Sequence, residues 1–160
     1  ETEVEGTKYT NLYDLKAKIR AESTDNEIIC KASIHLCNEQ LESLSNGFSD
    51  YQITYQFRSK TLKIIIDPLR DLSSQKDIYF ILPIIVDSTK EVVEESAKWV
   101  VLGKENGRLI LNTNSLFIRD TKKDETIFNV VPGVSAIPYK IRLKEKWTNV
   151  ITLTFETKND

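Results

Sequence analysis

The stretch that best indicates the fold is Tyr51-Gln-Ile-Thr-Tyr-Gln-Phe-Arg58, in which large apolar or aromatic side chains alternate with polar ones. A β-strand sends successive side chains to opposite faces, so this alternation predicts a half-buried strand with Tyr51, Tyr55 and Phe57 toward the core. A β-branched run follows at residues 62–66 and ends before an Asp-Pro pair. We therefore expect two consecutive strands here.

The same period of two recurs along most of the chain and predicts an all-β protein. The other expected strands are residues 13–21, 28–37, 77–86, 98–102, 108–112, 115–120, 126–131, 137–143 and 150–155. Loop segments rich in Asn, Ser, Gly, Pro or charged residues separate these strands. About ten short strands at close spacing are typical of an antiparallel β-sandwich.

Two segments are also compatible with helix. Residues 41–44 suit one short helical turn within a loop, and Ser88 followed by Glu91 imitates a capping box at the start of residues 88–102. We favour two strands in residues 88–102, because their second half is rich in Trp and Val and precedes a turn at residues 103–107. Residues 77–86 are almost wholly apolar, which predicts a central strand or one that crosses between sheets, although Pro83 requires an edge or a bulge.

Length and composition fit one globular domain. The chain has 160 residues, of which 40% are hydrophobic and 29% are charged, so we expect residues 1–160 to form a single β-sandwich domain. The chain begins at Glu1 and contains no methionine, so we expect either a processed product or a segment of a larger protein. A net charge of −2 gives no general attraction to nucleic acid, and no apolar run approaches the roughly 18 residues of a membrane span.

The two cysteines, Cys30 and Cys37, lie in one expected strand. If that strand is extended at about 3.3 Å per residue, their Cα atoms are roughly 23 Å apart, far beyond the ~7 Å limit for a disulfide. We therefore expect two free thiols on opposite faces, with Cys30 toward the core. Two free thiols do not decide the cellular compartment.

The sequence contains no recognisable group of catalytic or metal-binding residues. His35 is the sole histidine, and we interpret it as a surface or edge residue. One histidine and two cysteines on opposite faces do not suit a zinc site. A calcium site would need loop oxygens, here from Asn112, Asn114, Asp120 and Asp124, but no ligand-loop motif is present. We expect no metal, no cofactor and no enzymatic activity of the isolated chain.

One group of residues near the C-terminus is a candidate ligand-binding site, namely Lys140, Arg142, Lys144, Lys146 and Trp147. In an extended chain the four cations would lie about 6.7 Å apart on one face, a spacing that suits the repeating charges of an acidic polysaccharide. An exposed aromatic ring would stack on a sugar face. The alternative is a solvated outer face that acidic neighbours on adjacent strands balance.

Several short motifs carry a resemblance to a known family. They are Trp99-Val-Val-Leu-Gly-Lys, Gly107-Arg-Leu-Ile-Leu, Phe128-Asn-Val-Val-Pro-Gly-Val and Ala136-Ile-Pro-Tyr. This region resembles the closing β-sheet region of heparinase II/III-like polysaccharide lyases from gut and soil bacteria, over roughly residues 55–155 and most specifically over residues 128–138. Catalytic Tyr, His, Asn or Arg residues of that family lie mainly in an α/α-toroid that precedes the β-sheet domain. This chain has no such toroid, so the resemblance implies an accessory portion and carries over no catalytic residue.

Pattern and resemblance together predict a non-catalytic accessory β-sandwich module of a secreted or periplasmic bacterial protein that degrades or binds polysaccharide. The expected partners are an acidic polysaccharide and a neighbouring domain of the parent protein. The competing interpretation is a structural or adhesive Ig-like β-sandwich domain that contacts another protein. A large exposed apolar patch would favour this second interpretation.

Overall fold

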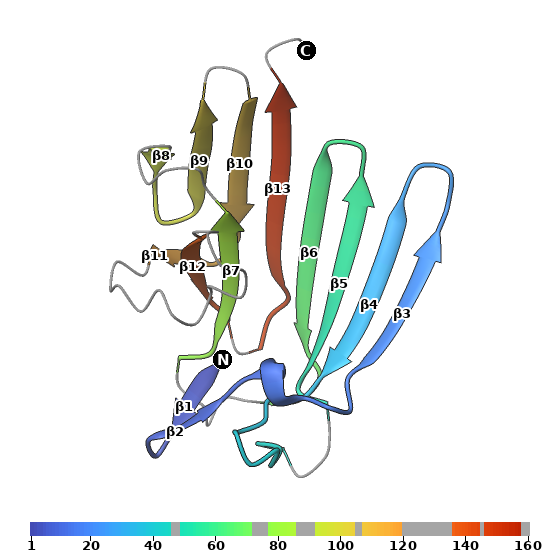
Figure 1. Ribbon diagram of the computed structural model, residues 1–160, viewed down its shortest axis with the longest axis vertical. Helices are drawn as coiled ribbons and strands as arrows, with labels where there is room; N and C mark the ends of the chain where they lie inside the picture. Colours follow the sequence, from blue (N-terminus) through green and yellow to red (C-terminus); the bar gives the residue numbers. More distant parts are fainter. Residues whose placement is uncertain are drawn as a thin grey trace.

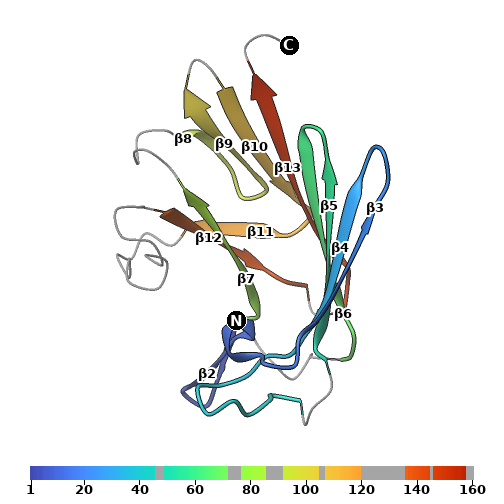
Figure 2. The same ribbon diagram turned by 45° about the vertical axis from the view of Figure 1, so that its right-hand side comes forward.

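The computed structural model describes residues 1–45, 49–71, 77–85, 92–104, 107–119, 136–144 and 146–157. Within these ranges nearly all elements are β-strands, arranged in three antiparallel sheets (Figures 1 and 2). The strands are β1 (Thr2–Val4), β2 (Thr7–Tyr9), β3 (Lys18–Ser23), β4 (Ile28–Ile34), β5 (Tyr51–Arg58), β6 (Thr61–Pro68), β7 (Tyr79–Ile85), β8 (Val92–Glu95), β9 (Trp99–Lys104), β10 (Gly107–Thr113), β11 (Leu116–Arg119), β12 (Ala136–Arg142) and β13 (Asn149–Thr157). One 3₁₀ turn, η1 (Asn11–Tyr13), follows β2.

The largest sheet has eight strands in the order β3-β4-β5-β6-β13-β10-β9-β8. At its centre, β5 and β6 form a hairpin in which Ile53 lies opposite Ile66 and Tyr55 opposite Ile64. The alternation at residues 51–58 therefore places one apolar row on one face of the sheet, as predicted. Tyr51 is buried and Tyr55 is half-buried, but the expectation that Phe57 lies in the core is wrong, because Phe57 lies near the uncovered end of β5 and is exposed. The chain returns at its C-terminus to insert β13 between β6 and β10.

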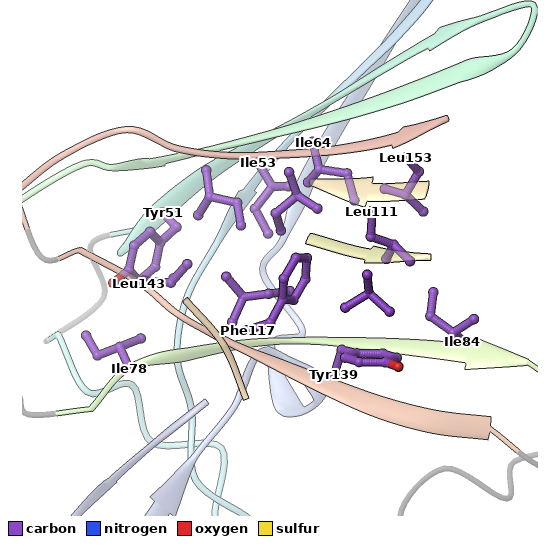
Figure 3. Close-up of a cluster of buried hydrophobic side chains, with 14 of the residues drawn as sticks. Tyr51, Ile53, Ile64, Ile78, Ile84, Leu111, Phe117, Tyr139, Leu143 and Leu153 are labelled. Carbon is purple, nitrogen blue, oxygen red and sulfur yellow. The ribbon is translucent and has the colours of Figure 1, made fainter. Parts of the chain in front are cut away.

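A smaller sheet of three strands, in the order β11-β12-β7, packs on the apolar face of the large sheet. Figure 3 shows the core between the two layers, with Ile53, Ile64 and Leu111 from the large sheet facing Phe117 and Tyr139 from the small one. Phe117 and Tyr139 make an edge-to-face contact with ring centroids 6.0 Å apart. The predicted fold, an antiparallel β-sandwich, is confirmed.

The small sheet places two prolines opposite each other, Pro83 on β7 and Pro138 on β12. Strand β7 lies at an end of its sheet, so the edge position that Pro83 requires is confirmed. The expectation of a central strand with both faces covered is wrong. The apolar run is explained by inward residues such as Ile84 and by Tyr79 and Ile81, which line a cavity beside the strand.

The first expected strand, residues 13–21, differs from the structure. Its beginning forms the end of η1, and the strand β3 starts only at Lys18. Every residue of β3 is exposed, because β3 is the edge strand of the large sheet and stands clear of the small sheet in both views (Figures 1 and 2). Alternation correctly predicted a strand, but the apolar face of this strand is not buried.

The expected helical turn at residues 41–44 is also wrong. This loop is held by side chains instead, since the Asn38 carboxamide accepts hydrogen bonds from the amides of Gln40 and Glu42 at 3.1 and 2.9 Å. The one short helical element in the described residues is η1. By contrast, the two strands favoured in residues 88–102 are present as β8 and β9, and β9 and β10 form the expected hairpin.

The loop after β4 is anchored by a buried carboxylate, that of Asp50. It accepts hydrogen bonds from the amide of Leu36 at 2.7 Å, from the hydroxyl of Ser45 and from the guanidinium of Arg70 at 2.8 Å. These bonds tie the ends of β4 and β6 to the intervening loop. The two cysteines are free as predicted, although Cys37 is the buried one and Cys30 is only half-buried. The expected strand at residues 126–131 lies outside the described residues.

Candidate functional site

The basic residues predicted as a ligand site lie on and just after β12. Tyr139, Ile141 and Leu143 point into the core and are buried, whereas Arg142 and Lys144, on either side of Leu143, are exposed. The alternation therefore places cations on the outer face of the small sheet, away from the core, which satisfies their need for solvent.

The expected row of four evenly spaced cations is only partly present. Strand β12 ends at Arg142, and Lys146 lies in a turn instead of continuing the strand. The cause is Asn149, which is fully buried and bonds to both sides of this turn. Its carboxamide oxygen accepts from the Lys144 amide at 2.8 Å, and its nitrogen donates to the carbonyls of Lys144 and Trp147 at 3.2 and 2.8 Å.

This turn exposes an aromatic ring beside the cations. The side chain of Trp147 is 71% exposed, next in sequence to the exposed Lys146. A further hydrogen bond fixes the Asn149 side chain, because its carboxamide oxygen also accepts from the Ser115 hydroxyl at 2.6 Å. The sequence indicated a loop at this point but gave no signal that Asn149 would organise it.

Each cation of the group has a partner in the structure. Arg142 pairs with Asp77 at 2.6 Å, and Lys146 pairs with Asp71 at 3.4 Å. Both pairs are more than half exposed, and such pairs contribute only about 0–1 kcal/mol. Lys144 donates to the carbonyl of Asn114 at 2.6 Å, and Lys140 lies 4.0 Å from the carboxylate of Glu1. The surface is therefore basic but partly neutralised, as the alternative explanation expected.

The prediction for His35 is wrong, because its side chain is buried instead of lying on the surface. Its ring Nδ1 lies 3.1 Å from both carboxylate oxygens of Asp14, and its backbone amide donates to the same group at 2.6 Å. Burial of Asp14 opposes ionisation, but the amides of His35 and Lys16 and the His35 ring together hold the pKa of Asp14 below its usual value. Sequence could not find this pair, since its members belong to different elements.

A hydroxyl completes a row of three polar groups at this point. Ser49 Oγ lies 3.4 Å from Nε2 of His35, on the side of the ring opposite Asp14. These residue types occur together in nucleophilic triads, but Ser49 does not line the surface depression in which Asp14, His35 and Cys37 lie. Asp14 already binds two backbone amides, so the arrangement anchors the segment after η1 to the end of β4.

The described part of the chain shows neither a metal site nor a membrane-spanning helix. Among its residues, no group of three or more His, Cys, Asp or Glu side chains is placed to hold a metal ion. Asp120 and Asp124, which the calcium alternative required, lie outside that part. The described residues also contain no helix that is long and apolar enough to cross a membrane.

A cavity lies between the two layers, beside the edge strand β7. Its volume is about 370 Å³, and its lining is mainly apolar. It is bounded by Tyr79, Phe80 and Ile81 of β7 on one side and by Ile53 and Tyr55 of β5 on the other. An apolar wall of this kind suits a hydrophobic segment better than a hydrated sugar polymer.

Fold and surface together define a class: an antiparallel β-sandwich module with a basic outer face that an exposed tryptophan adjoins. The sequence profile of the ulvan lyase C-terminal domain family matches residues 1–157. The chain belongs to this family.

A curated relative agrees with this assignment. The chain is 30% identical over 146 residues to a broad-specificity ulvan lyase from Formosa agariphila. The match covers 88% of this chain and 22% of that protein, so the chain spans about a fifth of the length of its relative. No solved structure matches the chain.

These comparisons refine the predicted resemblance. A C-terminal domain of a polysaccharide lyase is supported, whereas the heparinase II/III-like group is not the one they name. Three of the short motifs that carried the resemblance lie in the β9–β10 hairpin and in β12, and the motif at residues 128–134 lies outside the described residues. Such motifs describe strands and turns, so they identify a β-rich lyase domain more readily than a particular lyase family.

Proposed function

We propose that this chain is a single, non-catalytic accessory domain of an ulvan-degrading lyase, and that it binds an acidic polysaccharide through the basic group Arg142, Lys144 and Lys146 with Trp147. The family membership and the ulvan lyase relative support the first part. The observation that carries the second part is the exposed tryptophan, held next to outward-facing cations by the buried Asn149.

Ion exchange explains how partly neutralised cations would still bind. The acidic partners Asp71 and Asp77 are themselves exposed, so their pairs with Lys146 and Arg142 are weak and screened. A polymer that carries a charge on successive sugars would replace both carboxylates at once. Its second and third contacts then form at high effective concentration, which raises the affinity above that of any single pair.

Affinity electrophoresis and calorimetry with ulvan test this proposal. The triple change Arg142→Gln, Lys144→Gln and Lys146→Gln should weaken binding at least roughly tenfold, about 1.4 kcal/mol, and reduce its dependence on salt. Trp147→Ala should weaken binding while leaving the salt dependence unchanged. The control is Lys63→Gln, which removes an exposed cation from β6 and should have no effect.

The polymer panel should separate charge from sugar identity. Ulvan, a sulfated polymer and a uronic-acid polymer are compared with neutral dextran. Failure of every charged polymer to retard the folded domain would rule out the binding role. Cleavage of ulvan by the isolated domain would instead contradict the non-catalytic role.

The proposed role also implies a location. A polysaccharide is too large to cross a membrane unaided, so a domain that binds one would act in the periplasm or outside the cell. Detection of the parent protein in the periplasmic or culture fraction, against a cytoplasmic marker, would test this.

A protein-contact role is the second candidate, because the large sheet exposes several apolar side chains on its inner face. Exposed apolar patches of this kind mark interaction surfaces. If this role involved self-association, light scattering would show a dimer whose mass falls on dilution.

A further inference from the structure

The inner face of the large sheet is only partly covered. Residues on this face remain exposed on the edge strand β3 and at the outer ends of β4, β5 and β13, with exposed fractions of 73% for Ile19, 48% for Ile28, 41% for Phe57 and 49% for Phe155. Cross-strand pairing places Ile28 opposite Phe57, so the side chains of Ile28 and Phe57 are neighbours on this face. Figures 1 and 2 show β3, β4 and β5 standing clear of the small sheet.

The small sheet ends at β7, on the side that faces this uncovered surface. Strand β7 pairs with β12 along one edge, and among the described residues its other edge carries only Glu1. Glu1 and Tyr79 exchange two backbone hydrogen bonds, of 2.5 and 2.8 Å. This reciprocal exchange is the hydrogen-bonded pair of an antiparallel ladder.

The register of this ladder follows from the alternation of backbone directions. The amide and carbonyl of Tyr79 point to Glu1, whereas the carbonyl of Ile78 points to β12 and accepts from Leu143 at 2.9 Å. The backbone amide and carbonyl of Phe80 therefore point toward β12, and those of Ile81 point toward the open edge of β7. The backbone of Pro83 faces the open edge in the same way as that of Ile81. It offers only a carbonyl, because proline has no amide hydrogen.

The space beside this edge is the cavity of about 370 Å³ described above. Glu1, Tyr79, Phe80 and Ile81 line one side of it, and Tyr55 of the large sheet lines another. A strand added to the edge of β7 would occupy the cavity and extend the small layer over β5 and β4. Sandwiches normally bury both inner faces, so an added strand would complete this one.

We propose that β7 accepts a further β-strand, and that this strand is the polypeptide that precedes Glu1 in the longer lyase. The chain spans about a fifth of its ulvan lyase relative, so most of a protein of that length lies outside this domain. The segment before Glu1 enters antiparallel to β7, in continuation of the Glu1–Tyr79 pair. The accessory domain is therefore joined to its neighbour through a shared sheet.

The register assigns a role to each preceding residue. The residue immediately before Glu1 lies opposite Phe80 and faces the core side, so it is apolar. The second residue before Glu1 lies opposite Ile81 and exchanges two backbone hydrogen bonds with it. Beyond that point Pro83 supplies no amide, so the ladder ends within a few residues.

Amide hydrogen exchange measured by NMR tests this proposal. Residues 1–160 are compared with the same chain extended by the six residues that precede Glu1 in the parent protein. Exchange of the Ile81 amide should slow at least roughly tenfold in the extended chain. The Phe80 amide already points to β12, so its exchange should not change.

A pair of proline variants in the extended chain provides the matched control. Proline at the second position before Glu1 removes the amide that would donate to the Ile81 carbonyl, and its ring would be placed against β7, so the strand should not pair at this position and protection of the Ile81 amide should fall. Proline at the first position removes an amide that points away from β7, and protection should remain. Equal effects of the two prolines, or equal Ile81 exchange with and without the extension, would overturn the proposal.

A second copy of the domain is the other possible occupant of this edge. It would slow exchange of the Ile81 amide in residues 1–160 themselves, and increasingly so with protein concentration. That result would also overturn the proposal. Because the basic residues lie on the outer face of the small sheet, polysaccharide binding is measured independently of either result.

Discussion

In the isolated chain of residues 1–160, the free amino group of Glu1 links stability to pH. Burial lowers the pKa of this group from 8.0 to about 6, with Lys8 and Lys140 adding to the effect and the Glu1 carboxylate opposing it. The folded state therefore binds fewer protons than the unfolded state between about pH 6 and pH 8. In that window the free energy of unfolding rises with pH.

We expect residues 1–160 to be less stable at pH 5 than at pH 9 through this group, by about 3 kcal/mol for a shift of two pKa units. Acetylation of the amino group removes the charge but keeps an amide donor for Tyr79. Urea unfolding at both pH values should show that the acetylated protein lacks this part of the pH dependence. An identical pH dependence of both forms would contradict the prediction.

The two thiols differ in their environment, and this predicts a difference in reactivity. Cys37 is buried, and burial together with the carboxylates of Asp14 and Asp50 raises the pKa of its thiol. Cys30 is half-buried on the partly exposed inner face of β4. Iodoacetamide should therefore modify Cys30 first, as mass spectrometry of digested samples would show, and faster labelling of Cys37 would contradict this.

At the scale of elements, the turn after β12 depends on Asn149. Its side chain makes four hydrogen bonds, to the Ser115 hydroxyl, the Lys144 amide and the carbonyls of Lys144 and Trp147. Because the residue is fully buried, truncation leaves these groups without a partner and without water. The turn carries the exposed tryptophan, so this element couples stability to the proposed binding surface.

Asn149→Ala should lower the free energy of unfolding by about 1–3 kcal/mol. It should also weaken polysaccharide binding, because Lys146 and Trp147 lose their fixed placement. Asn149→Asp keeps the acceptor for Ser115 and Lys144, but it buries a carboxylate and turns one of its oxygens toward the carbonyls of Lys144 and Trp147, so it should be at least as destabilising as Asn149→Ala. Denaturant unfolding and affinity electrophoresis measure the two consequences, and unchanged binding by a folded Asn149→Ala variant would contradict the positioning role.

At the scale of the whole molecule, the two layers have different widths. Among the described residues the large sheet has eight strands and the small sheet three, so apolar residues of the same strand pattern meet different surroundings. Ile151 on β13 is fully buried under the small sheet, whereas Ile19 on β3 is exposed. Ile19 lies between Lys18 and Arg20, and Ile151 lies between Val150 and Thr152 in a strand that also alternates, so the pattern of the polar neighbours does not predict which of the two is covered.

This difference predicts unequal costs for the same substitution. Ile151→Ala should reduce the free energy of unfolding by about 2–5 kcal/mol, because it removes buried contacts and leaves a cavity. Ile19→Ala should cost less than about 1 kcal/mol in residues 1–160, since it removes an exposed side chain. Urea unfolding of the two variants measures both values, and similar costs would show that the uncovered face is packed in solution.

By itself, the sequence determined the elements. Alternation of side chains in segments such as residues 51–58 predicted strands, and their number and spacing predicted an antiparallel sandwich. Outward placement of Arg142 and Lys144 followed from the same period of two. These features depend on neighbouring residues along one chain, so a single sequence contains the information that they need.

Tertiary structure alone decided which faces are covered and which polar groups meet. The Asp14–His35 contact, the burial of Asn149 and the exposure of β3 all depend on contacts between segments far apart in sequence. A strand that lies under the second sheet and a strand that lies beyond the edge of that sheet have the same alternating sequence pattern. The pattern indicates only the direction in which each side chain points. What lies opposite each side chain is determined only by the relative width and placement of the two sheets.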